Sequence, residues 1–144
     1  MCFPQRFAAF KDVLMGNGLD FSEEFLVSGD YSIKSGFDSM NELLDRNLGI
    51  TAVFAVNDMM AIGAAKAVLT KGLDVPGDIS IVGYDGLDYG KYFNPSLTTV
   101  KQPNADFVRS SCDILLGIIE RNSKTRHIVL ETRFIERESC KRVN

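Results

Sequence analysis

The centre of the sequence contains two short apolar runs separated by an amphipathic run. Residues 52–56 and 79–82 are apolar without polar alternation and contain β-branched side chains, which is typical of strands buried on both faces of a parallel sheet. Between them, apolar residues recur at helical spacing, at Met59, Ile62, Ala65, Val68 and Leu69. Gly72 then stands where a helix C-cap is expected. The pattern predicts a strand–helix–strand unit with a right-handed crossover.

Further helices are predicted on both sides of this unit. The first begins at Arg6 and ends in the Gly- and Asn-containing stretch 15–18, the second is capped by Ser32 or Ser35, and the third begins near Pro103. Each carries an apolar stripe. The stripes consist of Phe7, Phe10 and Leu14 in the first helix, Phe37, Met40, Leu43 and Leu44 in the second, and Phe107, Cys112, Leu115, Ile118 and Ile119 in the third.

Short extended segments are expected between and after these helices. They are predicted at residues 25–27, 97–100, 128–130 and 133–135, with a polar loop over residues 83–96 and a polar turn over 121–125. The charged tail, residues 136–144, is expected to fray. Because helices and strands alternate along the sequence, the predicted class is α/β.

Composition and charge narrow the functional classes. The 144 residues suffice for one domain or part of a larger protein, and a net charge of −3 gives no basic footprint for nucleic acid. The sequence contains no run of 18 apolar residues, so no membrane span is predicted. Residues 1–9 lack the pattern of a signal peptide, and the cysteines Cys2, Cys112 and Cys140 are scattered and odd in number. We therefore expect reduced thiols and a cytoplasmic location.

Polar side chains follow both strands of the central unit. Asn57 and Asp58 come directly after the first apolar run, and Asp85 follows the second. Ligands of open parallel sheets bind outside the carboxyl ends of the strands. We interpret Asn57 as a ligand contact and Asp58 as the helix cap, although either side chain can cap a helix. Asp85 can accept hydrogen bonds from two hydroxyls or an amine, and its alternative role is that of a turn residue.

Nothing in the sequence predicts catalysis, a metal or a cofactor. His127 is the only histidine and has no cysteine or carboxylate pair at metal-ligand spacing. No Gly-rich phosphate loop follows either predicted strand, and no nucleophile signature is present. The sequence therefore favours a non-enzymatic protein.

Four sequence blocks occur in a characteristic order: FAVNDMMAIGAAKA, KGLDVPGDISIVGYDG, NPSLTTVKQP and FIERESC. A fifth block, RFAAFKDVL, precedes them. Together they resemble the effector-binding region of lactose-repressor-type (LacI/GalR) transcription regulators. One departure is Ala9, which stands where the family usually has glycine.

The resemblance implies a type I periplasmic-binding-protein fold, in which two three-layer αβα subdomains with mainly parallel sheets hold a ligand between them. Residues 1–99 would form most of the C-terminal subdomain. Residues 100–131 would cross into the N-terminal subdomain, and residues 132–144 would return as a strand and tail. The DNA-binding domain and most of the N-terminal subdomain are expected to lie outside this sequence. The apolar face of the helix after Pro103 would then lack its usual partner.

The resemblance also implies roles for individual residues. Arg6 corresponds to a ligand-contacting arginine, Tyr31 lies where the family often places a stacking aromatic, and Gln102 lies at the crossover. With Asn57 and Asp85, these residues form the expected ligand-binding set. They fit a sugar, or a nucleobase or nucleoside. No metal ligand or catalytic residue is expected.

The predicted function is therefore the small-molecule-sensing portion of a LacI-type regulator that acts as a homodimer. DNA would be bound through the N-terminal domain. The loop containing Tyr89, Tyr92 and Phe93 would lie near the dimer seam, or its aromatics would pack beneath the loop. Two alternatives are a stand-alone periplasmic-type sugar-binding protein and, less favoured, a Rossmann-like enzyme.

Overall fold

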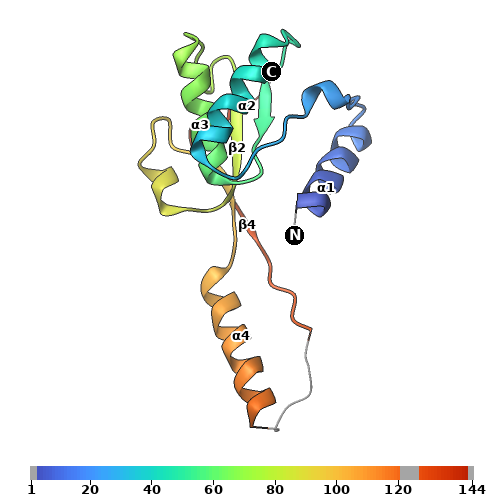
Figure 1. Ribbon diagram of the computed structural model, residues 1–144, viewed down its shortest axis with the longest axis vertical. Coiled ribbons are helices and arrows are strands. Elements are labelled where there is room, and N and C mark those ends of the chain that lie inside the picture. Colours follow the sequence, from blue (N-terminus) through green and yellow to red (C-terminus); the bar gives the residue numbers. More distant parts are fainter. Residues whose placement is uncertain (1–2, 121–126, 143–144) are drawn as a thin grey trace.

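The structure is a computed structural model that describes residues 3–120 and 127–142. Its elements are α1 (Phe3–Gly16), η1 (Glu23–Phe25), α2 (Ile33–Asp45), β1 (Ala52–Phe54), α3 (Asp58–Thr70), β2 (Ser80–Asp85), η2 (Asp88–Lys91), β3 (Thr98–Lys101), α4 (Asn104–Ile119) and β4 (Arg133–Ile135). Figure 1 shows an α/β body from which α4 and the segment leading to β4 extend as an arm. No described helix is long and apolar enough to cross a membrane.

The described strands form one sheet in the order β1-β2-β3-β4. β1 pairs with β2 and β2 with β3 in parallel, whereas β4 runs antiparallel to β3. This sheet confirms the predicted α/β class and the predicted strand–helix–strand unit. It also brings the carboxyl ends of β1, β2 and β3 to the same edge.

α2 and α3 cover one face of the sheet, and α1 contacts the other. On β1, Val53 packs against the core formed with α2 and α3. The next side chain, Phe54, points to the opposite face because side chains alternate along a strand. There it stacks on Phe10 of α1, with ring centroids 5.6 Å apart. The layers are therefore α2 and α3, the sheet, and α1.

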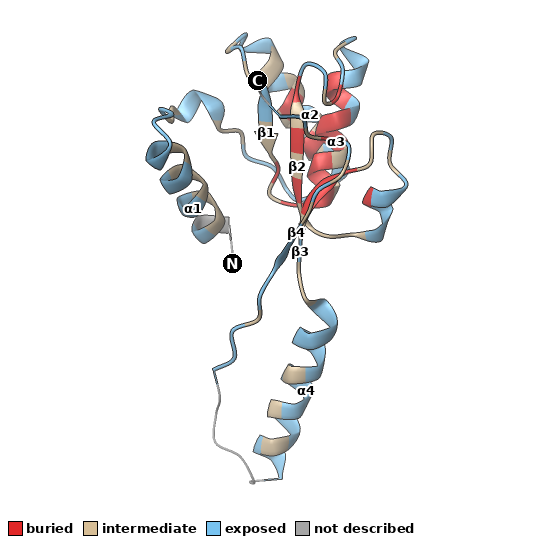
Figure 2. Ribbon diagram, turned by 180° about the vertical axis from the view of Figure 1, so that it is seen from behind, coloured by how far each residue is buried: buried red, intermediate tan, exposed pale blue. Residues whose placement is uncertain are grey.

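The core is concentrated around α3 (Figure 2). This helix is rich in alanine, and Ala61, Ala65 and Val68 are almost fully buried. α2 approaches closely because two glycines face the contact: a side chain at Gly36 would overlap the backbone of Met60, and one at Gly63 would overlap the backbone of Ile33. The hydrophobic effect then acts on nearly the whole circumference of α3.

Two predictions about secondary structure and chain ends are wrong. Residues 25–27 do not form a strand, because Phe25 ends the 3-10 helix η1, which Ser22 caps, and the next two residues pair with no described strand. The tail does not fray at Ser139, which is 1% exposed. Its hydroxyl donates to the carbonyl of Ile81 at 2.6 Å and accepts from the amide of Thr98 at 2.8 Å. The predicted turn over residues 121–125 lies outside the described residues.

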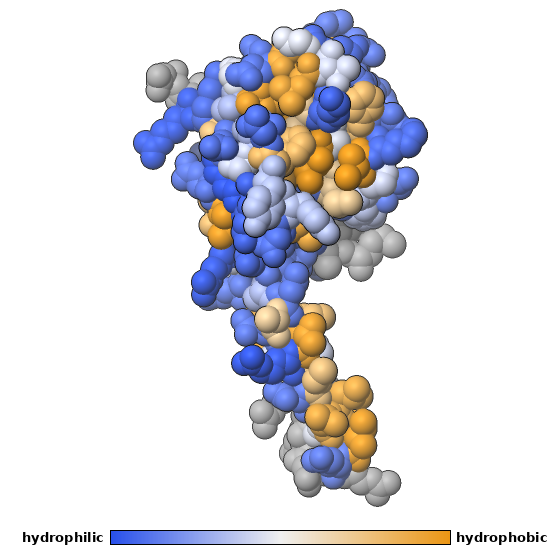
Figure 3. All heavy atoms as spheres, turned by 90° about the vertical axis from the view of Figure 1, so that its left-hand side faces the viewer, coloured by the Kyte–Doolittle hydropathy of each residue, from blue (hydrophilic) through white to orange (hydrophobic). Residues whose placement is uncertain are grey.

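α4 forms as predicted but buries none of its residues. Phe107, Leu115 and Ile119 are among its exposed apolar side chains, and Figure 3 shows hydrophobic residues gathered along this arm. Residues 128–130 belong to no described strand, whereas Arg133–Ile135 form β4. The division into residues 1–99, 100–131 and 132–144 remains a prediction.

Candidate ligand-binding site

Arg6 reaches from α1 to the carboxyl ends of β1 and β2. Its Nη1 donates a hydrogen bond of 2.8 Å to the carbonyl of Val56, just beyond β1. Its guanidinium carbon lies 3.6 Å from the centre of the Tyr84 ring on β2. A planar guanidinium held over an aromatic face keeps several N–H donors available for a ligand. The structure thus brings Arg6 to the edge of the sheet where a ligand is expected.

Asp85 and Gln102 meet at the same edge. Asp85 ends β2, and its Oδ1 accepts a hydrogen bond of 2.6 Å from Nε2 of Gln102, which follows β3. Burial raises the pKa of the Asp85 carboxyl, while the Gln102 hydrogen bond and the Arg6 charge act in the opposite direction. The carboxylate and the amide together offer both acceptors and a donor to a hydroxyl-rich molecule.

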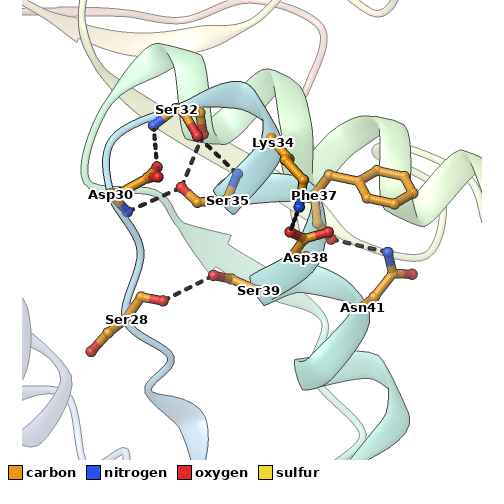
Figure 4. Close-up of polar contacts among 9 residues, drawn as sticks. All are labelled: Ser28, Asp30, Ser32, Lys34, Ser35, Phe37, Asp38, Ser39 and Asn41. Atoms are coloured by element: carbon orange, nitrogen blue, oxygen red, sulfur yellow. Dashed lines mark hydrogen bonds and ion pairs between the residues drawn. The ribbon is translucent and has the colours of Figure 1, made fainter.

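Tyr31 lies in a serine-rich turn before α2, and Figure 4 shows the hydrogen bonds among Asp30, Ser32 and Ser35 in this turn. The carboxylate of Asp30 accepts from the amide of Ser32, and the Asp30 amide donates to Oγ of Ser35. Hydrogen bonding to the side chains of Ser32 and Ser35 and to the Ser32 amide lowers the pKa of the Asp30 carboxyl to about 2. Ser32 also caps α2, as predicted, by accepting from the amide of Ser35. Tyr31 lies in this turn with a φ of 70° and remains 49% exposed.

Asn57, not Asp58, caps α3, so the sequence-based assignment of the cap is wrong. Oδ1 of Asn57 accepts a hydrogen bond of 2.8 Å from the amide of Met60. Nδ2 donates to the carbonyl of Tyr31 at 3.0 Å. The Asn57 side chain therefore ties the Tyr31 turn to the start of α3, and its predicted contact with a ligand stays a prediction.

Asp58 faces the interior. It is 0% exposed and accepts hydrogen bonds from the hydroxyl of Thr99 at 2.5 Å and the amide of Leu87 at 2.6 Å. The only sequence signal for this role is an aspartate at the start of an otherwise apolar helix, because its partners lie 41 and 29 residues away.

Two hollows adjoin the strand ends. The larger, about 810 Å³, lies between α1, the segment after η1 and β1, and Arg6 and Tyr31 line it among mostly apolar side chains. The smaller, about 380 Å³, is lined by Tyr84, Gln102 and residues at the base of the α4 arm. Arg6, which lines the larger hollow, contacts Tyr84, which lines the smaller one. In the described ranges, no three His, Cys, Asp or Glu side chains gather as they would around a metal ion.

The aromatic side chains of the loop that was predicted to lie near the dimer seam differ in exposure. Tyr89 and Tyr92 are 75% and 87% exposed, whereas Phe93 packs against the core. Packing beneath the loop therefore applies to Phe93 alone. Cys112 and Cys140 are free thiols among the described residues, and Cys2 lies outside them.

Comparison with known proteins identifies the family. A family model described as a periplasmic binding protein-like domain matches residues 3–140, and the chain belongs to this family. The chain is 44% identical over 135 residues to the HTH-type transcriptional regulator MalR of Clostridium butyricum. The aligned region covers 94% of this chain and 40% of MalR.

Solved structures of transcription regulators are also similar to this chain. The complex of the transcriptional regulator CelR with cellobiose has a TM-score of 0.88 at 32% identity and covers 93% of this chain and 41% of its own. The Lac repressor dimer bound to operator and the anti-inducer ONPF has a TM-score of 0.82 at 30% identity. This match covers 94% of this chain and 46% of the repressor chain. These matches confirm the predicted LacI/GalR resemblance. The chain spans about 40% of the length of the curated relative described above.

Proposed function

We propose that this chain is the small-molecule-sensing portion of a LacI-type transcription regulator. The observation that carries the proposal is the convergence of Arg6, Asp85 and Gln102 at the carboxyl ends of the parallel strands. Ligands of open parallel sheets bind at this edge. The family membership and the regulators among its relatives support the same reading.

The chemistry of the site fits a small polyhydroxylated effector. Arg6 supplies donors, Asp85 supplies acceptors, and Gln102 supplies both. The exposed face of Tyr31 suits the C–H face of a sugar ring or the plane of a nucleobase. A sugar is favoured because a structural neighbour was solved with cellobiose, and a nucleobase or nucleoside would use the same groups. The second lone pair of the Asn57 oxygen remains for an effector, since Met60 uses only one.

In the whole protein, the effector would bridge this subdomain and a second one. Closure around the effector would shift the equilibrium between two arrangements of a homodimer. DNA would be bound by an N-terminal domain outside this chain, in the cytoplasm. A Lac repressor neighbour was solved as a dimer on its operator, which supports this arrangement.

Native mass spectrometry of the full-length protein with cellobiose and with hypoxanthine tests the sensing role, because the effector would also contact the second subdomain. We expect a one-to-one adduct with one probe that weakens about tenfold in Gln102→Ala, because the side-chain amide that would hydrogen-bond the effector and orient Asp85 is lost. Arg109→Ala, a change at an exposed position on α4, is the matched control. Equal binding by both variants would remove Gln102 from the site.

The regulatory role needs the full-length protein. Titration of operator DNA with and without the bound probe should show an effector-dependent change in DNA affinity. A protein that binds the probe but never binds DNA would be a stand-alone sugar-binding protein, and this outcome would overturn the proposal.

A further inference from the structure

A buried carboxylate lies directly beneath the turn that ends β2. Asp58, at the start of α3, is 0% exposed. Its Oδ1 lies against Gly83 of β2, where any side chain would collide with it. Its two hydrogen bonds go to Thr99 of β3 and to the amide of Leu87 in the loop after β2. The helix dipole favours an anionic group at this end of α3.

The turn above Asp58 has a backbone that needs support. Asp85 has a φ of 124° and Gly86 a φ of 76°, and a non-glycine residue in this region is strained. The backbone amides of the two residues that follow Asp85 each donate a hydrogen bond to a buried side chain. The Leu87 amide donates to Asp58 at 2.6 Å, and the Gly86 amide donates to the Thr99 hydroxyl at 3.3 Å.

The Thr99 hydroxyl connects these contacts. It donates to Oδ1 of Asp58 at 2.5 Å while it accepts from Gly86. Thr99 is fully buried and pairs in register with Gly83. The carboxylate, the hydroxyl and the two amides therefore form one network that spans α3, β3 and the turn. Buried polar networks of this kind fix one geometry because breaking any member leaves the others unsatisfied.

We propose that Asp58, through Thr99, is a positioning residue that holds the Asp85 turn so that the Asp85 carboxylate faces Gln102 and the effector. The inference rests on the proposed function for the effector and on the structure for the turn. Asp58 touches no ligand in this scheme and acts only through Asp85. A sensing site with a preset acceptor loses less entropy on binding.

The opposing view is that Asp58 and Thr99 only stabilise the fold. Ser139 provides the matched control, because its hydroxyl is also buried and makes two hydrogen bonds, in this case to backbone groups of the same sheet. Those partners are Thr98 and Ile81, and neither lies in the Asp85 turn. Ser139→Ala should therefore lower stability without disturbing the site.

The first measurement is nuclear magnetic resonance of the whole chain in four forms: wild type, Thr99→Val, Thr99→Ser and Ser139→Ala. In Thr99→Val we expect the Gln102 side-chain amide signals to shift and the exchange of the Gly86 amide to accelerate about tenfold or more. Thr99→Ser keeps the hydroxyl and should restore both values. If Thr99→Val is folded and matches Ser139→Ala in both readouts, the positioning role is overturned.

Asp58→Asn provides a second test at the carboxylate. An amide can accept from Leu87 through its oxygen, but its nitrogen can only donate to the Thr99 hydroxyl, which then no longer donates to residue 58. We expect a partial shift of the Gln102 signals, smaller than in Thr99→Val. A Gln102 spectrum identical to wild type in both variants contradicts the proposal.

Effector binding is measured separately, by calorimetry of the full-length protein with cellobiose and with hypoxanthine. If wild type binds a probe, Thr99→Val should bind it about tenfold more weakly, and Ser139→Ala should bind it as wild type does. Equal binding by Thr99→Val would overturn the positioning role. If wild type binds neither probe while Thr99→Val still moves the Gln102 signals, the choice of effector fails and the positioning of Asp85 stands.

Discussion

The guanidinium of Arg6 lies over the ring of Tyr84, with 3.6 Å between its central carbon and the ring centre. This contact joins α1, on one face of the sheet, to the end of β2. The same side chain donates to the carbonyl of Val56. Arg6 therefore has a structural role in addition to its proposed role as an effector contact, and substitutions there should change both stability and binding.

Arg6→Met tests the structural part of that role. The variant loses the hydrogen bond to Val56 and the cation–π contact with Tyr84, so the free energy of unfolding should fall by about 1–2 kcal/mol. Urea denaturation followed by circular dichroism measures the change. Arg109→Met, at an exposed position on α4, should unfold at the wild-type urea concentration. An equal midpoint for Arg6→Met would show that α1 docks without help from Arg6.

Gly63→Ala should separate α2 from α3. A methyl group at this position would overlap the carbonyl of Ile33 and approach the amide of Phe37. Because both neighbours are backbone and cannot turn aside, we expect a loss of about 1–3 kcal/mol in the free energy of unfolding. Gly16→Ala, at the end of α1, places its methyl group in open space. It should leave stability unchanged or raise it by up to about 1 kcal/mol. A tolerated Gly63→Ala would mean that the helices can move apart freely.

The central unit could be predicted because its signals are local. The two apolar runs become β1 and β2, and the amphipathic run becomes α3 (Asp58–Thr70). Each of these elements is encoded within a stretch of consecutive residues. The family resemblance also placed Arg6, Asp85 and Gln102 in one ligand-binding set with Tyr31 and Asn57. The structure brings the first three side chains together, and contact of the set with a ligand stays a prediction.

The errors concern residues whose partners are distant in sequence. Asn57 and Asp58 are adjacent and can both cap a helix, and the choice depends on Thr99 and Leu87, which withdraw Asp58 into the core. The segment 25–27 is apolar enough for a strand, but no strand among the described residues pairs with it, and Phe25 belongs to η1. A strand needs a partner, and local pattern does not supply one.

Ser139→Ala tests the docking of the tail that sequence analysis expected to fray. Removing the hydroxyl leaves the buried amide of Thr98 without its acceptor, which should cost about 1–3 kcal/mol of unfolding free energy. Ser111→Ala, at an exposed position on α4, should change stability little. Thermal and urea unfolding of both variants give the comparison. If Ser139→Ala is as stable as wild type, water replaces the hydroxyl and the tail is held by other contacts.

Asp30 should stabilise the protein above acidic pH. Hydrogen bonds from Ser32 and Ser35 lower the pKa of its carboxyl from 3.8 to about 2. The folded state therefore binds fewer protons than the unfolded state between these values, and the contribution is complete above pH 3.8 and is lost as the pH falls toward 2. Asp30→Asn should flatten this part of the stability profile, and Ser35→Ala should flatten it partly. Urea midpoints measured across acidic pH would contradict this if all three proteins showed the same slope.

Asp85 should have the opposite dependence on pH. Burial raises the pKa of its carboxyl, so the folded state holds a proton that the unfolded state has lost. The contribution of Asp85 to stability is then greatest below pH 3.8 and decreases as the pH rises through the raised pKa. Asp85→Asn should remove this decrease and be more stable than wild type at neutral pH, while its affinity for a hydroxyl-rich effector falls because the anionic acceptor is gone. Urea midpoints at acidic and neutral pH, combined with calorimetry of the full-length protein, measure both effects. A variant that is less stable at neutral pH would show that the Gln102 hydrogen bond and the Arg6 charge outweigh the cost of burying the carboxylate.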